Sequence, residues 1–270
     1  MLMLTHTYLL QNVLSAKEIR HDDLDIFVYN IVPDLLTINP DISSRRTHII
    51  TRFPQIPDRY PKAAYVMFHL LVDDLTHYGS ICQNVPDEFN PDAQGYSHIK
   101  GKPLITSLLE FHDSIREEIT FDDAAYRSHL VIEMIYDLVI LDQIKHDQTI
   151  ELLAAAIHVT IENKMSEFIG TINWLYDLDE EEIRNVMNKA AVYLTAERMN
   201  KIMNIEGRIR LYGDKVGLPY HDPLHYSGIK KLFSEARDLL DGNDIFLTQT
   251  AKAIKDYGWL PPSHNLFNKA

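Results

Sequence analysis

The stretch FHLLVDDLTHYG, residues 68–79, decides both the fold class and the kind of site to expect. It places His69, Asp73 and His77 four residues apart within an apolar helical run. Each step of four advances by about 40° around an α-helix, so the three side chains project from one side. Such a face is either a metal-binding face or a set of buried polar groups that satisfy one another. The rest of the chain must decide between these two interpretations.

The composition limits the possible classes of protein. With 270 residues, of which 46% are hydrophobic, the chain can bury a substantial core. Its single cysteine, Cys82, excludes an internal disulfide and a thiol-rich metal site, and fits the reducing cytoplasm, where we expect the protein. No apolar run reaches the roughly 18 residues that span a bilayer. The net charge of −13 argues against stable binding to nucleic acid, unless carboxylates hold divalent cations.

Helical periodicity runs through most of the chain, and Pro, Gly and Asn mark the segments between. We find no strand pairing, no repeat and no linker between halves of different composition. The sequence therefore predicts one all-α domain over residues 1–270, with loops at 33–57, 83–102 and 212–228. The predicted helices cover residues 5–19, 22–32 (stopping before Pro33), 58–81 (with Gly79 as an end signal), 103–119, 121–147, 149–169, 177–203, 228–241 and 245–256.

Other segments supply matching ligands. SHLVIEMIYD holds His129 and Glu133, again four residues apart, on an apolar face where an unpaired carboxylate would be costly. Asp34 follows a Pro, and His48 comes fourteen residues later. A mixed nitrogen and oxygen set of this kind suits zinc or another first-row divalent ion. The candidate ligands are His6, Asp34, His48, His69, Asp73, His77, His129 and Glu133.

In this order the motifs resemble those of the zinc-dependent phospholipase C and single-strand-specific nuclease superfamily, whose members are all-helical and hold three zinc ions. THTYLLQNVL, NIVPD, FHLLVDDLTHYG and SHLVIEMIYD carry the resemblance, which covers roughly residues 5–137. The C-terminal half shows no motif that we can match. The resemblance implies a single multi-helix domain of the zinc-dependent phospholipase C type.

The resemblance also implies an assignment of ligands to two or three zinc ions. The first ion would be held by Asp34, His48, His69 and Asp73. The second would be held by His77, His129 and Glu133. Asp73 would bridge to a third ion, held also by His6.

The chain departs from the family's pattern in three ways. Secreted members bind the third ion through an N-terminal Trp, whereas this chain has no Trp near its start, and Met1 would have to take its place. The spacing from Asp73 to His77 is shorter than usual. The longer gap from His77 to His129 implies an inserted loop and helix, so His98 is an alternative ligand in place of His77.

The resemblance implies a metal-dependent phosphoester hydrolase that acts on a small-molecule or lipid-like phosphoester. Asp34 is the candidate for orienting or deprotonating the attacking water. The alternative is a non-catalytic, metal-stabilised helical protein. A di-iron carboxylate bundle ranks lower, because it would use ExxH pairs where this chain has HxxxD and HxxxE.

Two further features have an ordinary structural interpretation. His158 and Glu162 repeat the HxxxE spacing, but core packing or a solvated edge explains them more simply. Arg45 and Arg46 precede His48 and are candidates for binding a substrate phosphate, although paired arginines on loops are usually solvated.

Overall fold

The computed structural model describes residues 2–14, 19, 23–53, 55–83, 89–143, 148–240 and 245–262. Within these ranges helices provide all the regular secondary structure, and no strand occurs. The predicted all-α class is therefore confirmed. None of the helices in these ranges is both long enough and apolar enough to cross a membrane.

The N-terminal helices carry most of the candidate ligands. They are α1 (Met3–Val13), α2 (Asp25–Leu36), α3 (Ser44–His48) and α4 (Ala63–His77). The prediction that the second helix stops before Pro33 is wrong, because α2 continues one turn further. Leu35 and Leu36 in that last turn are fully buried, and their burial outweighs the preference against proline inside a helix. As a result, Asp34 lies on a helix and not in a loop.

The segment predicted as a loop over 33–57 also contains α3, which Ser43 caps by accepting a hydrogen bond from the backbone N–H of Arg46. Helix α4 is shorter than the predicted helix over 58–81, because it begins at Ala63 and ends at His77. The predicted end signal fits: Gly79 has φ +77°, in the left-handed region that follows many helix ends.

The central part of the chain contains α5 (Tyr96–Gly101), α6 (Leu104–Ser114) and α7 (Phe121–Gln143). The prediction of one polar loop over 83–102 is wrong for its second half, where α5 forms. Gly95 lies at the start of α5 and donates its backbone N–H to the carbonyl of His77 at 3.2 Å. A Cβ atom at this position would lie 2.1 Å from the carbonyl carbon of His77, so only glycine permits this approach to the end of α4.

In the C-terminal half, a helical region begins with α8 (Thr149–Val159), passes through a π-helical turn (Thr160–Lys164) and continues as α9 (Met165–Tyr176). The expected helix over 177–203 is interrupted near Thr195 into α10 (Glu180–Tyr193) and α11 (Ala196–Ile202). The loop predicted over 212–228 is wrong at both ends, because α12 (Ile205–Val216) and α13 (Pro223–Leu240) extend into it. Helix α14 (Phe246–Asp256) agrees with its prediction.

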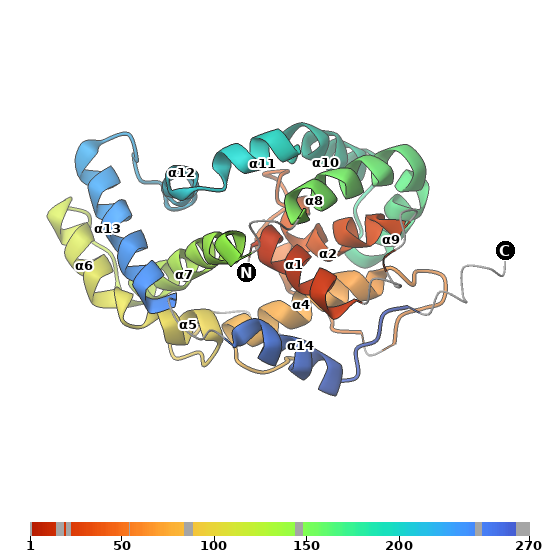
Figure 1. Cartoon of the computed structure of the whole chain (residues 1–270), viewed down its shortest axis with the longest axis horizontal. Helices are drawn as coiled ribbons and strands as arrows, with labels where there is room; N and C mark the ends of the chain where they lie inside the picture. Colours follow the sequence, from red (N-terminus) through yellow and green to blue (C-terminus); the bar gives the residue numbers. More distant parts are fainter. Residues whose placement is uncertain are drawn as a thin grey trace.

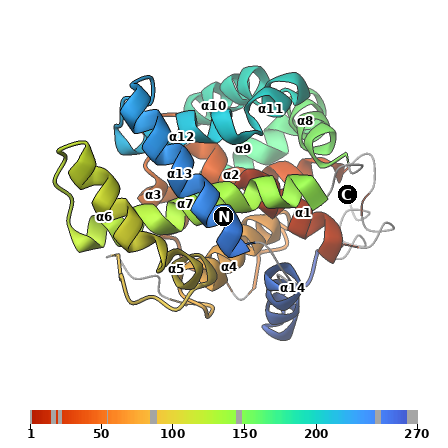
Figure 2. The same cartoon turned by 60° about the vertical axis from the view of Figure 1, so that its left-hand side comes forward.

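Helices α4 and α7 organise the arrangement. Helix α2 packs along α4, while α5, α6 and α13 pack on α7. Figures 1 and 2 show α8, α10 and α11 on one side of this centre and α14 on the opposite side. The side chains of α2 and α4 are almost entirely buried, so their polar residues lie inside the protein.

Candidate metal centre

The structure brings the eight predicted ligands together into three groups. In each group, one donor atom from every member lies within 4.8 Å of the others. The first two groups share His69, and the third has no member in common with them. In order, the groups are His6–His69–Asp73, Asp34–His48–His69, and His77–His129–Glu133. These residues come from α1, α2, α3, α4 and α7, so five helices converge on the site.

Asp73 lies between the first two groups. Its Oδ1 atom lies 3.1 Å from Nε2 of His6, and its Oδ2 atom lies 3.2 Å from Nε2 of His69. The same Oδ2 atom lies 3.5 Å from Nε2 of His48, which is also 3.5 Å from Oδ1 of Asp34. The two oxygens of one carboxylate therefore face different sets of imidazoles. A carboxylate in this arrangement could bridge two ions.

The third group lies further along α4. Nε2 of His77 lies 2.8 Å from Oε1 of Glu133, and the rings of His77 and His129 are 5.6 Å apart. His98, the alternative to His77, belongs to none of the three groups. It stacks instead on the ring of His129, with centroids 4.7 Å apart. The geometry therefore favours His77 as the donor and leaves His98 as a neighbour.

Several donor atoms of the centre are buried without a hydrogen-bond partner among the described residues. They are Nδ1 of His6, His69 and His129, Oδ2 of Asp34, and Nε2 of His6 and of His69. These two Nε2 atoms lie 3.1 and 3.2 Å from the oxygens of Asp73, but not in hydrogen-bonding geometry. Buried polar atoms without a partner are costly, and native proteins seldom leave several together. Divalent ions would satisfy these atoms, so the residues present fit a metal centre.

Electrostatics hold most of these side chains in the protonation state that binds metal. Burial, together with the neighbouring His6, lowers the pKa of His69 to about 4, and burial places the pKa of His129 well below its usual value. Burial alone would raise the pKa of Asp34, but its hydrogen bond with His48 and the nearby imidazoles lower it to about 2. Near neutral pH, His69 and His129 are therefore neutral donors and Asp34 is an anion.

His48 is the exception. Burial acts to lower its pKa, but Asp34 and Asp73 outweigh burial and raise it. Its Nδ1 atom lies 2.9 Å from the carbonyl oxygen of Ser44, which can only accept a hydrogen bond. Nδ1 therefore carries a hydrogen, and Nε2 is the atom left to face the two carboxylates.

Arg52 fixes the position of His48 relative to α4. Its guanidinium donates to the backbone carbonyls of His48 and Ile50 at 2.9 and 2.8 Å. The same group makes a two-pronged ion pair with Asp74, at 2.6 and 3.2 Å. Since Asp74 follows Asp73 directly, Arg52 joins the segment after α3 to the helix that carries the shared carboxylate.

A second buried ion pair anchors α12 beside the centre. Asp137, one turn after Glu133 on α7, accepts hydrogen bonds from the backbone and side chain of Thr5, which precedes His6. It also accepts from Arg208 of α12 at 2.9 Å. The C-terminal half of the chain, where the sequence shows no motif, therefore supports two of the ligand-bearing helices.

The three groups open into a cavity of about 320 Å³. Asp34, His48, Asp73, His77, His129 and Glu133 contribute to its walls. Phe89, Tyr126 and His98 form an aromatic part of the lining, and Arg45 and Lys215 are also among the lining residues. The ligand set is therefore accessible to a small molecule.

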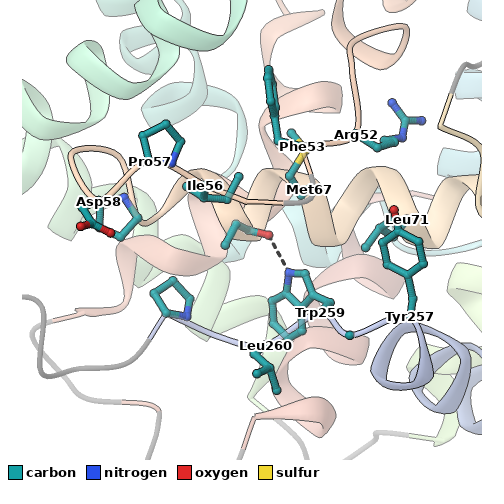
Figure 3. Close-up of a pocket in the computed structure, with 14 residues that line it drawn as sticks. Arg52, Phe53, Ile56, Pro57, Asp58, Met67, Leu71, Tyr257, Trp259 and Leu260 are labelled. Carbon is teal, nitrogen blue, oxygen red and sulfur yellow. Dashed lines mark hydrogen bonds between the residues drawn. The ribbon is translucent and has the colours of Figure 1, made fainter.

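A larger hollow of about 480 Å³ lies on another face of α4 (Figure 3). Its lining is mainly apolar and includes Met67, Leu71 and Trp259, whose indole N–H donates to the carbonyl of Ala64 at 2.9 Å. Among the described residues that line it there is no histidine and a single carboxylate, that of Asp58. The candidate donor groups therefore line the smaller of these two cavities.

Some sequence-based expectations fall outside the centre. Exposed His158 belongs to none of the three groups, in agreement with its ordinary interpretation. Arg46 donates to the carbonyls of Tyr176 and Asp177 at the end of α9, so only Arg45 of the pair lines the cavity. The expectation that Met1 replaces an N-terminal Trp lies outside the described residues.

Sequence reasoning did not find Arg52, Asp74, Arg208 or Lys215. Of these, only Asp74 had a local signal, because it stands beside Asp73 in a buried helical run. Comparison of the chain with family models, with curated proteins and with solved structures finds no match.

Proposed function

We propose that the protein is a phosphoester hydrolase whose active site is a multinuclear centre of zinc ions. The observation that carries this proposal is Asp73, whose two oxygens face different imidazole sets at 3.1 and 3.2 Å beside an accessible cavity. The donor chemistry supports zinc, because imidazole and carboxylate together suit this ion. The order of the ligands along the chain, which resembles the zinc-dependent phospholipase C and nuclease superfamily, supports the same reaction class.

Hydrolysis forms a bond from a water oxygen to phosphorus and breaks the ester P–O bond, and the departing alcohol carries away a proton. Divalent ions supply charge neutralisation at the phosphate and activate water for attack. Asp34 accepts a hydrogen bond from the water and orients it, since its Oδ2 atom has no other partner among the described residues. Arg52 holds the backbone of His48 in place while substrate enters and product leaves.

The alternative is a centre that only stabilises the fold. A structural zinc site is closed by four protein ligands, whereas a catalytic site keeps an open position. Members of all three donor groups line the cavity of about 320 Å³, apart from the buried His6 and His69. The cavity therefore favours the catalytic proposal over the structural one.

The test begins with protein purified without chelator. Elemental analysis should find at least two divalent ions per chain, mainly zinc. The preparation should hydrolyse p-nitrophenyl phosphate or bis(p-nitrophenyl) phosphate, a chelator should abolish the activity, and zinc should restore it. His129→Ala should lose metal, whereas the matched control His158→Ala, which changes the same HxxxE spacing on α8, should retain it.

Two results would count against the proposal. Fewer than one ion per chain after reconstitution would exclude the metal centre. At least two ions per chain, with no hydrolysis of monoesters or diesters, would favour the stabilising role.

A further inference from the structure

The cavity carries cationic side chains that are not part of the donor groups. Three such residues line it: Arg45, Arg52 and Lys215. Arg52 is engaged with Asp74 and with two backbone carbonyls, and it is nearly fully buried. Arg45 and Lys215 are exposed residues at the wall of the cavity. Lys215 is therefore a cation that an incoming anion can meet.

Lys215 reaches this position because α12 is anchored close to the centre. The buried ion pair between Arg208 and Asp137 fixes α12 against α7, the helix that carries His129 and Glu133. Lys215 lies seven residues after Arg208, which places the two on the same side of α12. Since Lys215 shares the cavity lining with His129 and Glu133, this side of the helix faces the centre.

No ion pair or hydrogen bond joins Lys215 to another residue in the part of the chain that the structure describes. The neighbouring charged residues of α12 differ in this respect, because Arg208 pairs with Asp137, and Arg210 lies 3.8 Å from Asp214. A cation that lines a reactive cavity without a protein partner can pair with a ligand. The chain therefore has a positive group in place for an anion.

The charges of the cavity indicate which anion. Asp34, Asp73 and Glu133 contribute three negative charges, which two divalent ions would more than offset. Lys215 then adds further positive charge at the wall, even though the whole chain carries a net charge of −13. A phosphomonoester carries close to two negative charges near pH 7, whereas a phosphodiester carries one. The excess of positive charge matches the monoester better.

We propose that Lys215 forms an anion subsite that makes dianionic phosphomonoesters the preferred substrates of this centre. The inference rests on the proposed phosphoester hydrolase function. Lys215 pairs with the additional negative charge that a monoester has and a diester lacks. It acts as a residue that determines specificity, and the metal ligands are present for both substrate types.

The test compares two probes on zinc-loaded protein, p-nitrophenyl phosphate and bis(p-nitrophenyl) phosphate. In Lys215→Ala the ratio of kcat/KM for the monoester to kcat/KM for the diester should fall about tenfold, the low end of what a hydrogen bond between charged groups contributes. Lys215→Arg keeps the charge and should keep most of the ratio. Lys231→Ala is the matched control, because Lys231 is an exposed lysine on α13 outside the cavity lining, and it should leave the ratio unchanged.

An unchanged ratio in Lys215→Ala, or an equal loss for both probes, would overturn the subsite while leaving the hydrolase function in place. If neither probe is hydrolysed, the hydrolase proposal fails, and calorimetric titration of zinc-loaded protein with inorganic phosphate still tests the subsite. Lys215→Ala should then weaken phosphate binding about tenfold. Equal phosphate affinity in Lys215→Ala and the parent protein would overturn the subsite. A thermal melt of each variant, with the same midpoint as the parent protein, shows that the fold is intact.

Discussion

Replacing Asp73 with asparagine tests the centre at its most connected residue. The variant Asp73→Asn keeps the size of the side chain and removes the charge that faces His6 through Oδ1 and both His69 and His48 through Oδ2. It should therefore weaken the first two groups together and leave the group of His77, His129 and Glu133 intact. His6→Ala is the comparison, because His6 contacts Asp73 within the first group, whereas Asp73 also lies 3.5 Å from His48 of the second group.

The size of the effect follows from binding linkage. An ion present at 100 times its dissociation constant stabilises the native state by about 2.7 kcal/mol, so losing two ions costs about 5 kcal/mol and losing one costs about half of that. With an unfolding entropy of about 2.1 cal/mol/K per residue, a chain of this length loses roughly 9 °C in Tm for two ions and about 5 °C for one.

The assay is a pair of thermal melts for each variant, one with zinc and one with chelator, together with metal content per chain. The difference between the two melts isolates the metal contribution from any packing lost with the side chain. Asp73→Asn should lose more of this difference, and more metal, than His6→Ala. Equal metal content in the two variants, or a loss of Tm that persists unchanged in chelator, would refute the bridging role.

Three other predictions concern the same centre. Asp34→Asn should reduce turnover more than it reduces metal occupancy at the His129–Glu133 group; a parallel loss of both would contradict its role in orienting water. In Arg52→Lys the single ammonium group cannot contact Asp74 and both backbone carbonyls at once. Metal affinity should therefore fall about tenfold or more in the groups containing His48 and Asp73. Competition with a chromophoric chelator measures this affinity, and an equal loss in the third group would argue against the role of Arg52. In metal-stripped protein, burial lowers the pKa of His69 and of His98 to about 4. The unfolded chain therefore binds more protons than the folded chain between about pH 6.5 and pH 4. As the pH falls through this window, the free energy of unfolding should decrease by up to about 3 kcal/mol for each of these histidines. The raised pKa of His48 offsets part of the loss. Urea melts at several pH values check the sign, which a flat profile would contradict.

The sequence predicted which candidate donors lie on one face of a helix, because helical spacing is a local property. His69, Asp73 and His77 share a face of α4 whatever the rest of the fold does, and the same holds for His129 and Glu133 on α7. Helix boundaries were less predictable where burial opposed local preference, as at Pro33, where the last turn of α2 survives because its leucines are buried.

The supporting residues could not be predicted, because their partners are distant in sequence. Arg52 meets Asp74 across 22 residues, and Arg208 meets Asp137 across 71. In sequence, each of these charged residues is equally compatible with a solvated surface. Only the packing of α12 against α7 places Lys215 at the cavity, and no local pattern indicates that packing.

The contact of Gly95 with the end of α4 has a consequence for how this protein can change over evolutionary time. The chain leaves the centre at His77 and returns to α4 at Gly95 before α5 begins, so the intervening segment starts and finishes beside the same carbonyl group. Insertions or deletions in such a closed excursion cost little, since each doubling of loop length adds only about 0.6 kcal/mol. The number of residues between these two positions can therefore change while the two ends stay fixed. Homologous chains should vary in length here and should retain glycine at the second position.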